Sequence, residues 1–431
     1  MAEIILSKYF NTPNAHTLDF YLSHGGYEAA KKVLSTMKPA DVIDQVKTSN
    51  LRGRGGAAFS AGMKWSFVPK DSPKPKFLVV NADESEPGTF KDKYILSTDP
   101  HQLIEGILIT CYAIGSHKAY VYIRGEYVFP FKRLQAAVEE AYQKNYLGKN
   151  VLGLGFDLDV VVHRGAGAYI CGEESALLES LEGKKGLPRL RPPFPAIVGL
   201  FGCPTVINNV ETVAWVPHII NRGAQWFNDL GGNVKDGGNR LFFVSGHVNK
   251  PGVYELPASV TLRSLIYDHA GGVRSGKKLK AVIPGGISSS ILLPNEIDVK
   301  MEADALKAAG TMIGSAGVIV MDESTCIVEA LRSASHFFAH ESCGQCSPCR
   351  EGTGWVEKIV DRILAGQGRE QDLANLLSIA GNMCGTTICA FGDAAATPVI
   401  SYIKKFRPEF EFHIKEGHCE IRQEQGQHVH D

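Results

Sequence analysis

The 431-residue chain has no hydrophobic run long enough to cross a membrane. The longest run, Met312 to Met321, is half of what a membrane-spanning helix needs. The first residues lack both the basic start of a signal peptide and the arginine-rich character of a transit peptide. These absences predict a cytoplasmic bacterial protein that is not itself inserted in a membrane.

An excess of charge of one sign is also missing. The 45 basic residues are balanced by 46 acidic ones, and no long basic run occurs. This balance argues against nucleic acid or an anionic membrane surface as the main partner. Low-complexity segments and internal repeats are absent as well, and the chain is too long for one hydrophobic core, so we expect several globular domains.

Cysteine is too scarce for a disulfide scaffold, and its distribution is uneven. Ten cysteines occur in the chain. Five stand alone and are expected to pack as small apolar residues, namely Cys111, Cys171, Cys203, Cys326 and Cys419. The other five crowd together near the C-terminal end: Cys343, Cys346, Cys349, Cys384 and Cys389. In a reducing compartment such crowding indicates metal or redox chemistry.

The crowded cysteines begin with a C-x2-C-x2-C run at Cys343, Cys346 and Cys349. Three thiolates on one tight loop can hold three corners of an iron–sulfur cubane. A bacterial ferredoxin usually has its next cysteine four residues after the third, but position 353 of this chain is Thr. The fourth ligand must therefore come from elsewhere, and the spacing leaves both Cys384 and Cys389 as candidates. Four thiolates could also bind zinc, but zinc loops usually pair two C-x2-C motifs, so the triple favours iron and sulfur.

Hydrophobic patterning predicts an α/β protein with additional parts. Short buried-type strands at 77–80, 119–123 and 156–162 alternate with helical spacing, which is typical of a parallel sheet with crossover helices. From about residue 240 the pattern becomes that of a small mixed β domain similar to a β-grasp (ubiquitin-like) module. After Thr325 four amphipathic stripes predict a four-helix bundle, with the crowded cysteines in its links.

Three polar loops accompany the predicted parallel sheet. Arg52 to Gly56, with Lys64 downstream, offers free amides and cations to a phosphate. His163 to Glu174 leads from a strand into a helix, and Asn81 to Gly88 follows the first strand, where open α/β sheets bind ligands. The standard G-x-G-x-x-G dinucleotide fingerprint is absent. Each loop alone is equally compatible with a simple turn or a solvated acidic segment, but together with the cysteine motif they favour cofactor binding.

Five segments, all in order along the chain, closely resemble the NADH-binding flavoprotein of respiratory complex I, the family of the F or 51 kDa subunit. They are Leu51 to Trp65, Asn81 to Gly88, Gly165 to Glu174, Asn208 to Asn209, and Ser342 to Arg350. The resemblance implies four regions. These are an N-terminal segment with the glycine-rich loop (1–61), a Rossmann-like FMN/NADH domain (62–235), a β-grasp (SLBB-like) domain (236–325) and a helical bundle with a [4Fe–4S] cluster (326–431).

The resemblance also implies the residues that contact each cofactor. Those implied for FMN are Gly53, Arg54, Gly55, Gly56, Lys64, Asn81, Asp83, Glu84, Tyr169, Gly172, Glu173, Asn208, Asn209 and Thr212. Those implied for NADH are Phe59, Phe67, Glu86, Glu174 and Phe194, with the aromatic rings against the adenine. The implied cluster ligands are Cys343, Cys346, Cys349 and Cys389, which selects Cys389 over Cys384. We further predict that Glu86 and Glu174 disfavour NADPH by repelling its additional phosphate.

The implied activity is oxidation of NADH through FMN, with the electrons passed singly to the cluster, and no side chain needs to act as acid, base or nucleophile. Expected partners are a thioredoxin-like [2Fe–2S] subunit and a large multi-cluster iron–sulfur subunit, in a peripheral arm on the cytoplasmic face of the bacterial inner membrane. One alternative is the equivalent subunit of a soluble NAD-linked hydrogenase or formate dehydrogenase. Another, of a different class, is a zinc-stabilised interaction protein that is not an enzyme.

Overall fold

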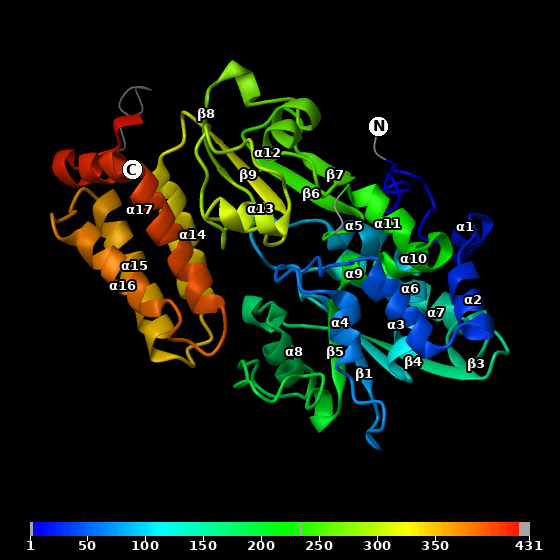
Figure 1. The fold of residues 1–431 in the computed structure, drawn as a ribbon. Coiled ribbons are helices and arrows are strands. Elements are labelled where there is room, and N and C mark those ends of the chain that lie inside the picture. The colour runs from blue at the N-terminus through cyan, green and yellow to red at the C-terminus, as the bar shows by residue number, and fades with distance from the viewer. Residues whose placement is uncertain (1–2, 233–234, 422–431) are drawn as a thin grey trace.

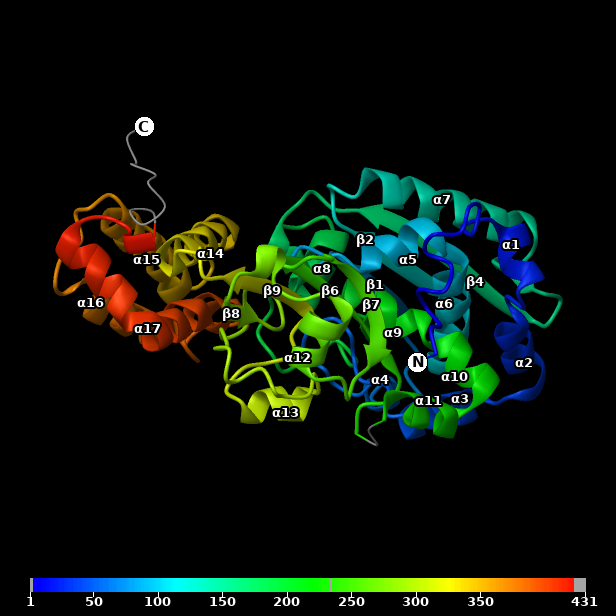
Figure 2. The ribbon, with the colours of Figure 1, turned by 90° about the horizontal axis from the view of Figure 1, so that it is seen from above.

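The computed structural model describes residues 3–232 and 235–421, which form two β-sheets and a C-terminal group of helices (Figure 1). The larger sheet with its helices and the C-terminal helices α14 to α17 lie at opposite ends of the molecule (Figure 2). The smaller sheet lies between them. Among the helices of the described segments, none combines the length and the apolar character that crossing a membrane requires.

The larger sheet has the strand order β3-β4-β2-β1-β5. Strands β1, β2, β4 and β5 run parallel, and β3 is antiparallel to β4. The strands are β1 (Phe77–Ala82), β2 (Lys118–Ile123), β3 (Gly148–Val151), β4 (Phe156–Arg164) and β5 (Thr205–Asn209). The predicted parallel sheet is confirmed, with β3 and β5 added at its edges; both are short, and β5 ends in two polar asparagines, so neither has a strong strand pattern.

Helices cover both faces of this sheet. They are α1 (Leu18–Ser23), α2 (Glu28–Thr36), α3 (Pro39–Thr48), α4 (Ala61–Ser66), α5 (Asp92–Thr98), α6 (Pro100–Ile114), α7 (Val128–Gln143), α8 (Glu174–Leu181), α9 (Val210–Ala214), α10 (Val216–Arg222) and α11 (Ala224–Gly231). Two 3-10 turns, η1 (Tyr169–Gly172) and η2 (Leu200–Gly202), lie in the loops.

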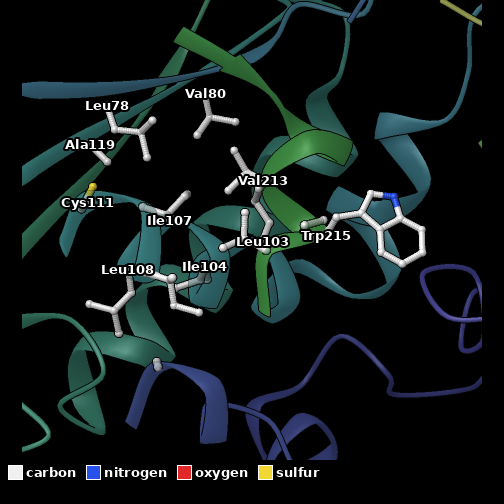
Figure 3. Close-up of a cluster of buried hydrophobic side chains, with 14 of the residues drawn as sticks. Leu78, Val80, Leu103, Ile104, Ile107, Leu108, Cys111, Ala119, Val213 and Trp215 are labelled. Carbon is white, nitrogen blue, oxygen red and sulfur yellow. The ribbon is translucent and has the colours of Figure 1, made fainter. Parts of the chain in front are cut away.

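Helix α6 is the centre of the first hydrophobic core. Nearly all of its residues are buried, so it has no solvent-facing side. Its residue Ile107 lies close to Leu78 and Val80 of β1 and Ala119 of β2 (Figure 3). Side chains alternate between the two faces of a strand, and Phe77 and Val79 accordingly belong to a second core on the opposite face. The helical spacing predicted from Leu103 to Cys111 is confirmed.

The smaller sheet has the order β7-β6-β9-β8, with β6 and β9 parallel and the outer pairs antiparallel. Its elements are β6 (Asn239–Gly246), β7 (Gly252–Pro257), β8 (Leu279–Ile283) and β9 (Gly317–Asp322), with helices α12 (Leu262–Ser264) and α13 (Ala303–Ala308), the π turn η3 (Leu265–His269) and the 3-10 turn η4 (Arg274–Gly276). Ala281 and Ile283 of β8 belong to the core shared with the C-terminal helices, so the two parts are packed together.

The C-terminal helices are α14 (Ile327–Glu341), α15 (Ser347–Leu364), α16 (Asp372–Met383) and α17 (Phe391–Glu416). The four stripes predicted from the sequence are the buried faces of these helices. Helix α17 contains Pro398 and Pro408 and departs from helical geometry at Phe406, as an internal proline requires. The link before α15 holds Cys343 and Cys346, and the link before α17 holds Cys389. Cys349 lies in the first turn of α15, so the prediction that all the crowded cysteines lie in links is wrong for this residue.

Candidate functional site

A cavity of about 310 Å³ lies where the three parts of the molecule meet. The carboxyl ends of β1 and β5 border it, which is where open α/β sheets bind ligands. Its volume falls within the range of about 300–1,000 Å³ typical of small-molecule sites. The part of the chain around the larger sheet supplies Arg54, Gly55, Gly56, Asn81, Asp83, Glu84, Ser85, Glu86, Thr89, Lys91, Asp92, Tyr169, Ile170, Gly172, Glu173 and Asn209. The part around the smaller sheet supplies Gly285, Ser288, Met312, Gly314 and Ser315. The start of α17 and the residue before it supply Ala390, Phe391 and Ala394.

Glycines keep the cavity wall free of side chains. Gly56 has a φ of +140°, a left-handed conformation that side chains disfavour. A Cβ atom on Gly55 would lie 3.1 Å from the Cβ of Asn209, and one on Gly172 would lie 3.1 Å from Oδ2 of Asp83. The backbone of both loops is therefore packed closely against neighbouring parts of the wall, and ligand contact at these loops remains a prediction.

The carboxylate of Glu84 is fully engaged within the protein. Its Oε1 accepts hydrogen bonds from the amides of Lys91 (2.7 Å) and Asp92 (2.8 Å), and its Oε2 accepts one from the hydroxyl of Tyr127 (2.9 Å). These bonds fix the start of α5 to the end of β1. Glu84 therefore shapes the cavity wall, and its side chain has little capacity left for a ligand.

Burial raises the pKa of two other acidic groups of the cavity. Burial raises the pKa of Asp83 to about 7, although the hydroxyl of Ser85 opposes the shift. Burial also raises the pKa of Glu86, against hydrogen bonds from the hydroxyl of Tyr169 (2.6 Å) and the amide of Ser288 (2.8 Å). A carboxyl group that keeps its proton can donate a hydrogen bond to a ligand.

Lys91 is a cavity residue that no sequence motif singled out. Its ammonium is 2% exposed and lies 2.6 Å from Asp92, 3.2 Å from Glu211 and 3.0 Å from Oδ1 of Asn209. Burial lowers the pKa of Lys91, but the surrounding carboxylates outweigh it and the net shift is upward. The only sequence signal that could have indicated Lys91 as a site residue was its position just after the acidic loop. Its pairing with Glu211 could not be predicted, because the two residues are 120 positions apart.

Several residues implied for FMN hold the loops from behind the cavity. The hydroxyl of Thr212 accepts a hydrogen bond from the amide of Arg54 (2.8 Å), and Oδ1 of Asn208 accepts one from Nε1 of Trp65 (2.8 Å). Arg54 is one of the cavity residues, and its guanidinium pairs with Asp236 at 2.7 Å. Among the described residues, neither Nε of Arg54 nor Oγ of Ser288 has a hydrogen-bond partner, although both are buried.

The residues implied for NADH lie mainly outside the cavity wall. Phe59, Phe67 and Phe194 are 52%, 49% and 58% exposed, and the rings of Phe59 and Phe67 are 6.2 Å apart. Of this set only Glu86 lines the cavity.

Lys64 and Glu174, implied for different cofactors, form an ion pair of 2.7 Å. Arg191 approaches the other oxygen of Glu174 at 2.9 Å. Burial opposes ionisation of Glu174, but the two cations outweigh it and hold the pKa of this carboxyl below its usual range. Arg191 was not among the predicted residues.

The structure brings Cys389 to the cysteines of the C-x2-C-x2-C loop. Burial raises the pKa of Cys389 to about 11; its backbone hydrogen bond to Phe391 opposes this, and Glu173, Cys343 and Cys349 add to it. The adjacent amide of Ile388 donates to Sγ of Cys346 at 3.3 Å. Cys384 is exposed, and its pKa is raised by burial and by Asp393 alone, with no contribution from a cysteine. The geometry therefore favours Cys389 over Cys384.

The spacing of these four thiols suits a cluster better than a single ion. In the described ranges, three or more potential ligand atoms lie within 4.8 Å of one another only at Cys326, His413 and Cys419. The cysteines of the loop and Cys389 are thus farther apart than the ligands of one zinc ion, as the corners of a cubane require.

Aromatic side chains connect the cavity with the cysteines. Phe391, two residues after Cys389, lines the cavity. Its ring lies 5.8 Å from that of Tyr169 and 5.5 Å from that of Phe338. A ligand in the cavity and a cluster on the cysteines would therefore be neighbours with only a thin layer of side chains between them.

Comparisons with known proteins match the three parts of this architecture separately. The Nuo51 FMN-binding domain family matches residues 46–218, the SLBB domain family matches 240–320, and the NADH-ubiquinone oxidoreductase-F iron-sulfur binding region matches 329–413. The fold and the site thus define a flavoprotein with an additional iron–sulfur region.

Full-length relatives narrow the assignment. The chain is 53% identical over 419 residues to the NADH-quinone oxidoreductase F subunit numbered 2 of Rhizobium meliloti (strain 1021), covering 97% of this chain and 99% of the relative. It is 52% identical over 422 residues to the NADH-quinone oxidoreductase F subunit of Mycobacterium tuberculosis (strain H37Rv), covering 96% and 94%. The chain belongs to the F (51 kDa) family of NADH-quinone oxidoreductase, the NADH-oxidising flavoprotein of complex I, which binds FMN and a [4Fe–4S] cluster.

A solved structure of another enzyme class has the same fold. The air-oxidised NAD⁺-reducing [NiFe]-hydrogenase contains a chain with a TM-score of 0.83 and 35% identity, covering 96% of this chain and 67% of that one. The sequence identity to this hydrogenase chain is lower than the identity to the F subunits, which disfavours the alternative of a hydrogenase subunit. The family assignment excludes the other alternative, a zinc-stabilised interaction protein that is not an enzyme.

Proposed function

We propose that FMN lies in the cavity between the glycine loop and the acidic loop, in contact with the residues that line it. Arg54, Lys91 and Ser288 line this cavity, and the unpartnered Nε of Arg54 and Oγ of Ser288 are buried donors that a ligand can satisfy. Asn208 and Thr212 act behind the wall by holding Trp65 and the glycine loop in place. Bound there, FMN supplies hydride acceptance and release of single electrons.

NADH is proposed to bind at the exposed aromatic side of this site. Phe59, Phe67 and Phe194 offer flat apolar surfaces to the adenine ring, and Glu86 reaches into the cavity. Glu174 stays ionised because Lys64 and Arg191 pair with it, so it can accept hydrogen bonds from ribose hydroxyls. Lys64 is therefore assigned to the orientation of Glu174 and only secondarily to phosphate.

The proposed cluster ligands are Cys343, Cys346, Cys349 and Cys389. Their place beside Phe391 supports electron exit from the cavity towards the C-terminal helices. We assign the acceptors to a thioredoxin-like [2Fe–2S] subunit and a large multi-cluster subunit of the same complex, on the cytoplasmic face of the bacterial inner membrane. The finer description of the fold is proposed with it: a Rossmann-like domain (62–235) after the N-terminal segment, a β-grasp domain (236–325) and a four-helix bundle (326–431).

The observation that carries the flavin assignment is the glycine-lined part of the cavity wall, where Gly55, Gly56 and Gly172 present backbone in place of side chains. Replacing Gly172 by Val places a side chain in that space. We expect Gly172→Val to lose most of its bound FMN and its NADH oxidation while it keeps its iron and acid-labile sulfide, which report that the chain is folded. Flavin absorbance and iron per chain are the measurements.

The matched control is Gly381→Ala, because a Cβ atom on Gly381 meets nothing within 4 Å. Gly381→Ala should bind FMN as the wild type does. A Gly172→Val protein with full FMN content and unchanged NADH oxidation would contradict the assignment of the cavity.

A further inference from the structure

Two cysteines and a histidine that are distant in the sequence meet at one end of the C-terminal helices. Cys326 directly precedes α14, His413 lies in the last turn of α17, and Cys419 follows α17. One side-chain ligand atom from each lies within 4.8 Å of those of the other two. Sγ of Cys326 is 3.4 Å from Nε2 of His413. Both cysteines were expected to be isolated core residues, and their proximity corrects that prediction.

The donor set is that of a zinc site. Two thiolates and one imidazole are soft and borderline ligands, which select Zn²⁺ over Mg²⁺ or Ca²⁺. Ligands at the corners of a tetrahedron around zinc lie about 3.5–3.8 Å apart, given bonds of about 2.0–2.3 Å. The distance between Cys326 and His413 is already close to this value, and the ligand atom of Cys419 lies within 4.8 Å of both.

Burial and charge at the site agree with a bound cation. Cys326 and His413 are 4% and 1% exposed, so both are fixed by packing, whereas Cys419 is partly exposed. The nearby Glu409 is already engaged, since its oxygens accept from Nζ of Lys280 and from the amide of Ile327, each at 2.7 Å. Three protein ligands therefore bind the ion, and the partly exposed side is open to a water molecule as the fourth.

We propose that Cys326, His413 and Cys419 bind one Zn²⁺ that is distinct from the [4Fe–4S] cluster and shares no ligand with it. Binding displaces the two thiol protons into solvent and leaves a neutral unit of one dication and two thiolates. The ion joins the residue before the first C-terminal helix to a residue that follows the last one. It thereby closes the ends of the whole region that carries the iron–sulfur cluster.

The test is zinc per FMN in the complex that contains this chain, purified without added zinc and measured by plasma mass spectrometry. Cys326→Ser and Cys419→Ser should each lose one zinc per FMN, with iron per FMN unchanged. Cys419→His should retain it, because imidazole replaces thiolate as a ligand. His418→Asn is the matched control on the neighbouring residue and should also retain the zinc.

The zinc absorption edge of the wild type provides a second measurement that does not depend on any variant. We expect two sulfur neighbours at about 2.3 Å and nitrogen or oxygen at about 2.0 Å. Equal zinc contents in the wild type and in Cys326→Ser would overturn the proposal. So would a Cys326–Cys419 disulfide in the anaerobically purified wild type, detected by peptide mass spectrometry.

Discussion

The acidic residues around the cavity carry out different tasks although they are close in sequence. Glu84 accepts backbone hydrogen bonds and orders the loop, burial raises the pKa of Asp83 and Glu86, and two cations lower the pKa of Glu174. The residue type alone did not distinguish these roles. Burial and the partner atoms of each carboxyl decide them.

At the cluster, the two candidate fourth ligands can be separated directly. Cys389→Ser should lose most of the roughly four irons and four sulfides of a cubane. Cys384→Ser should keep them, since Cys384 is exposed and no cysteine contributes to its pKa shift. Iron and sulfide assays and the electron paramagnetic resonance signal of the reduced protein check both variants. Loss of iron in Cys384→Ser alone would reverse the assignment.

Selectivity for the nucleotide depends on Glu174. In Glu174→Gln, Lys64 loses its anionic partner and Arg191 keeps only Glu173 at 3.7 Å, so both cations become more available to the additional phosphate of NADPH. We expect the ratio of kcat/KM for NADPH to that for NADH to rise about three- to tenfold, the effect of about one partly exposed ion pair. Asp361→Asn, which removes a carboxylate 3.1 Å from Arg332 on the C-terminal helices, is the control. An unchanged ratio in Glu174→Gln would show that the residue has no role in this selectivity.

Asp99 should make the stability of the protein depend on pH. Burial raises its pKa from 3.8 to about 7, so the folded protein binds a proton more tightly than the unfolded chain. This difference in proton binding adds to the free energy of unfolding fully below about pH 4, and the contribution is lost as the pH rises through 7. Its size is at most about 4 kcal/mol. Asp99→Asn should reduce the fall in thermal midpoint between pH 5 and 8, measured by calorimetry. Identical pH profiles for the two proteins would contradict this prediction.

At the scale of elements, α6 shows why a helix without a polar face forms here. It is enclosed by the sheet on one side and by the N-terminal helices on the other. Its buried Glu105 is satisfied by the amides of Tyr27 and Ala30, each at 2.9 Å, which attach α2 to it. A buried carboxylate is tolerated because hydrogen-bond donors surround it.

Shortening one side chain of α6 should therefore be costly. Ile107 is fully buried against β1 and β2, so Ile107→Ala leaves a cavity that neighbouring elements cannot fill. We expect a loss of about 2–5 kcal/mol in the free energy of unfolding, measured by urea denaturation. Ile4→Ala, at a position that is 52% exposed, should change it by less than about 0.5 kcal/mol. Equal effects of the two substitutions would contradict the packing described for α6.

At the scale of the whole molecule, the cavity depends on all three parts of the chain. Its wall combines loops of the larger sheet, loops around Ser288 of the smaller sheet and the start of α17. A ligand that binds there stabilises the arrangement of the three parts as well as each wall. The site does not exist in any one part alone.

Removing FMN should accordingly destabilise the molecule as a unit. At a free FMN concentration about 100 times its Kd, binding adds about 2.7 kcal/mol to the folded state. We expect the thermal midpoint to fall when FMN is removed and to recover when it is added back, and proteolysis in the link between β9 and α14 to become faster without FMN. A midpoint and a cleavage rate that do not respond to FMN would show that the three parts are independent of the cavity.

The sequence by itself determined the features whose signals are local. The C-x2-C-x2-C loop, the strands at 77–80, 119–123 and 156–162, the glycine loops and the helical stripes after Thr325 depend on spacing between near neighbours, and spacing is visible in one chain. The tertiary structure decided the features whose partners are distant. Lys91 meets Glu211, Ser288 reaches the cavity beside β1 and β5, and Cys326 meets Cys419 only because packing of the sheets and helices brings them together. Burial and contact between such residues follow from the whole fold, so no local pattern contains them.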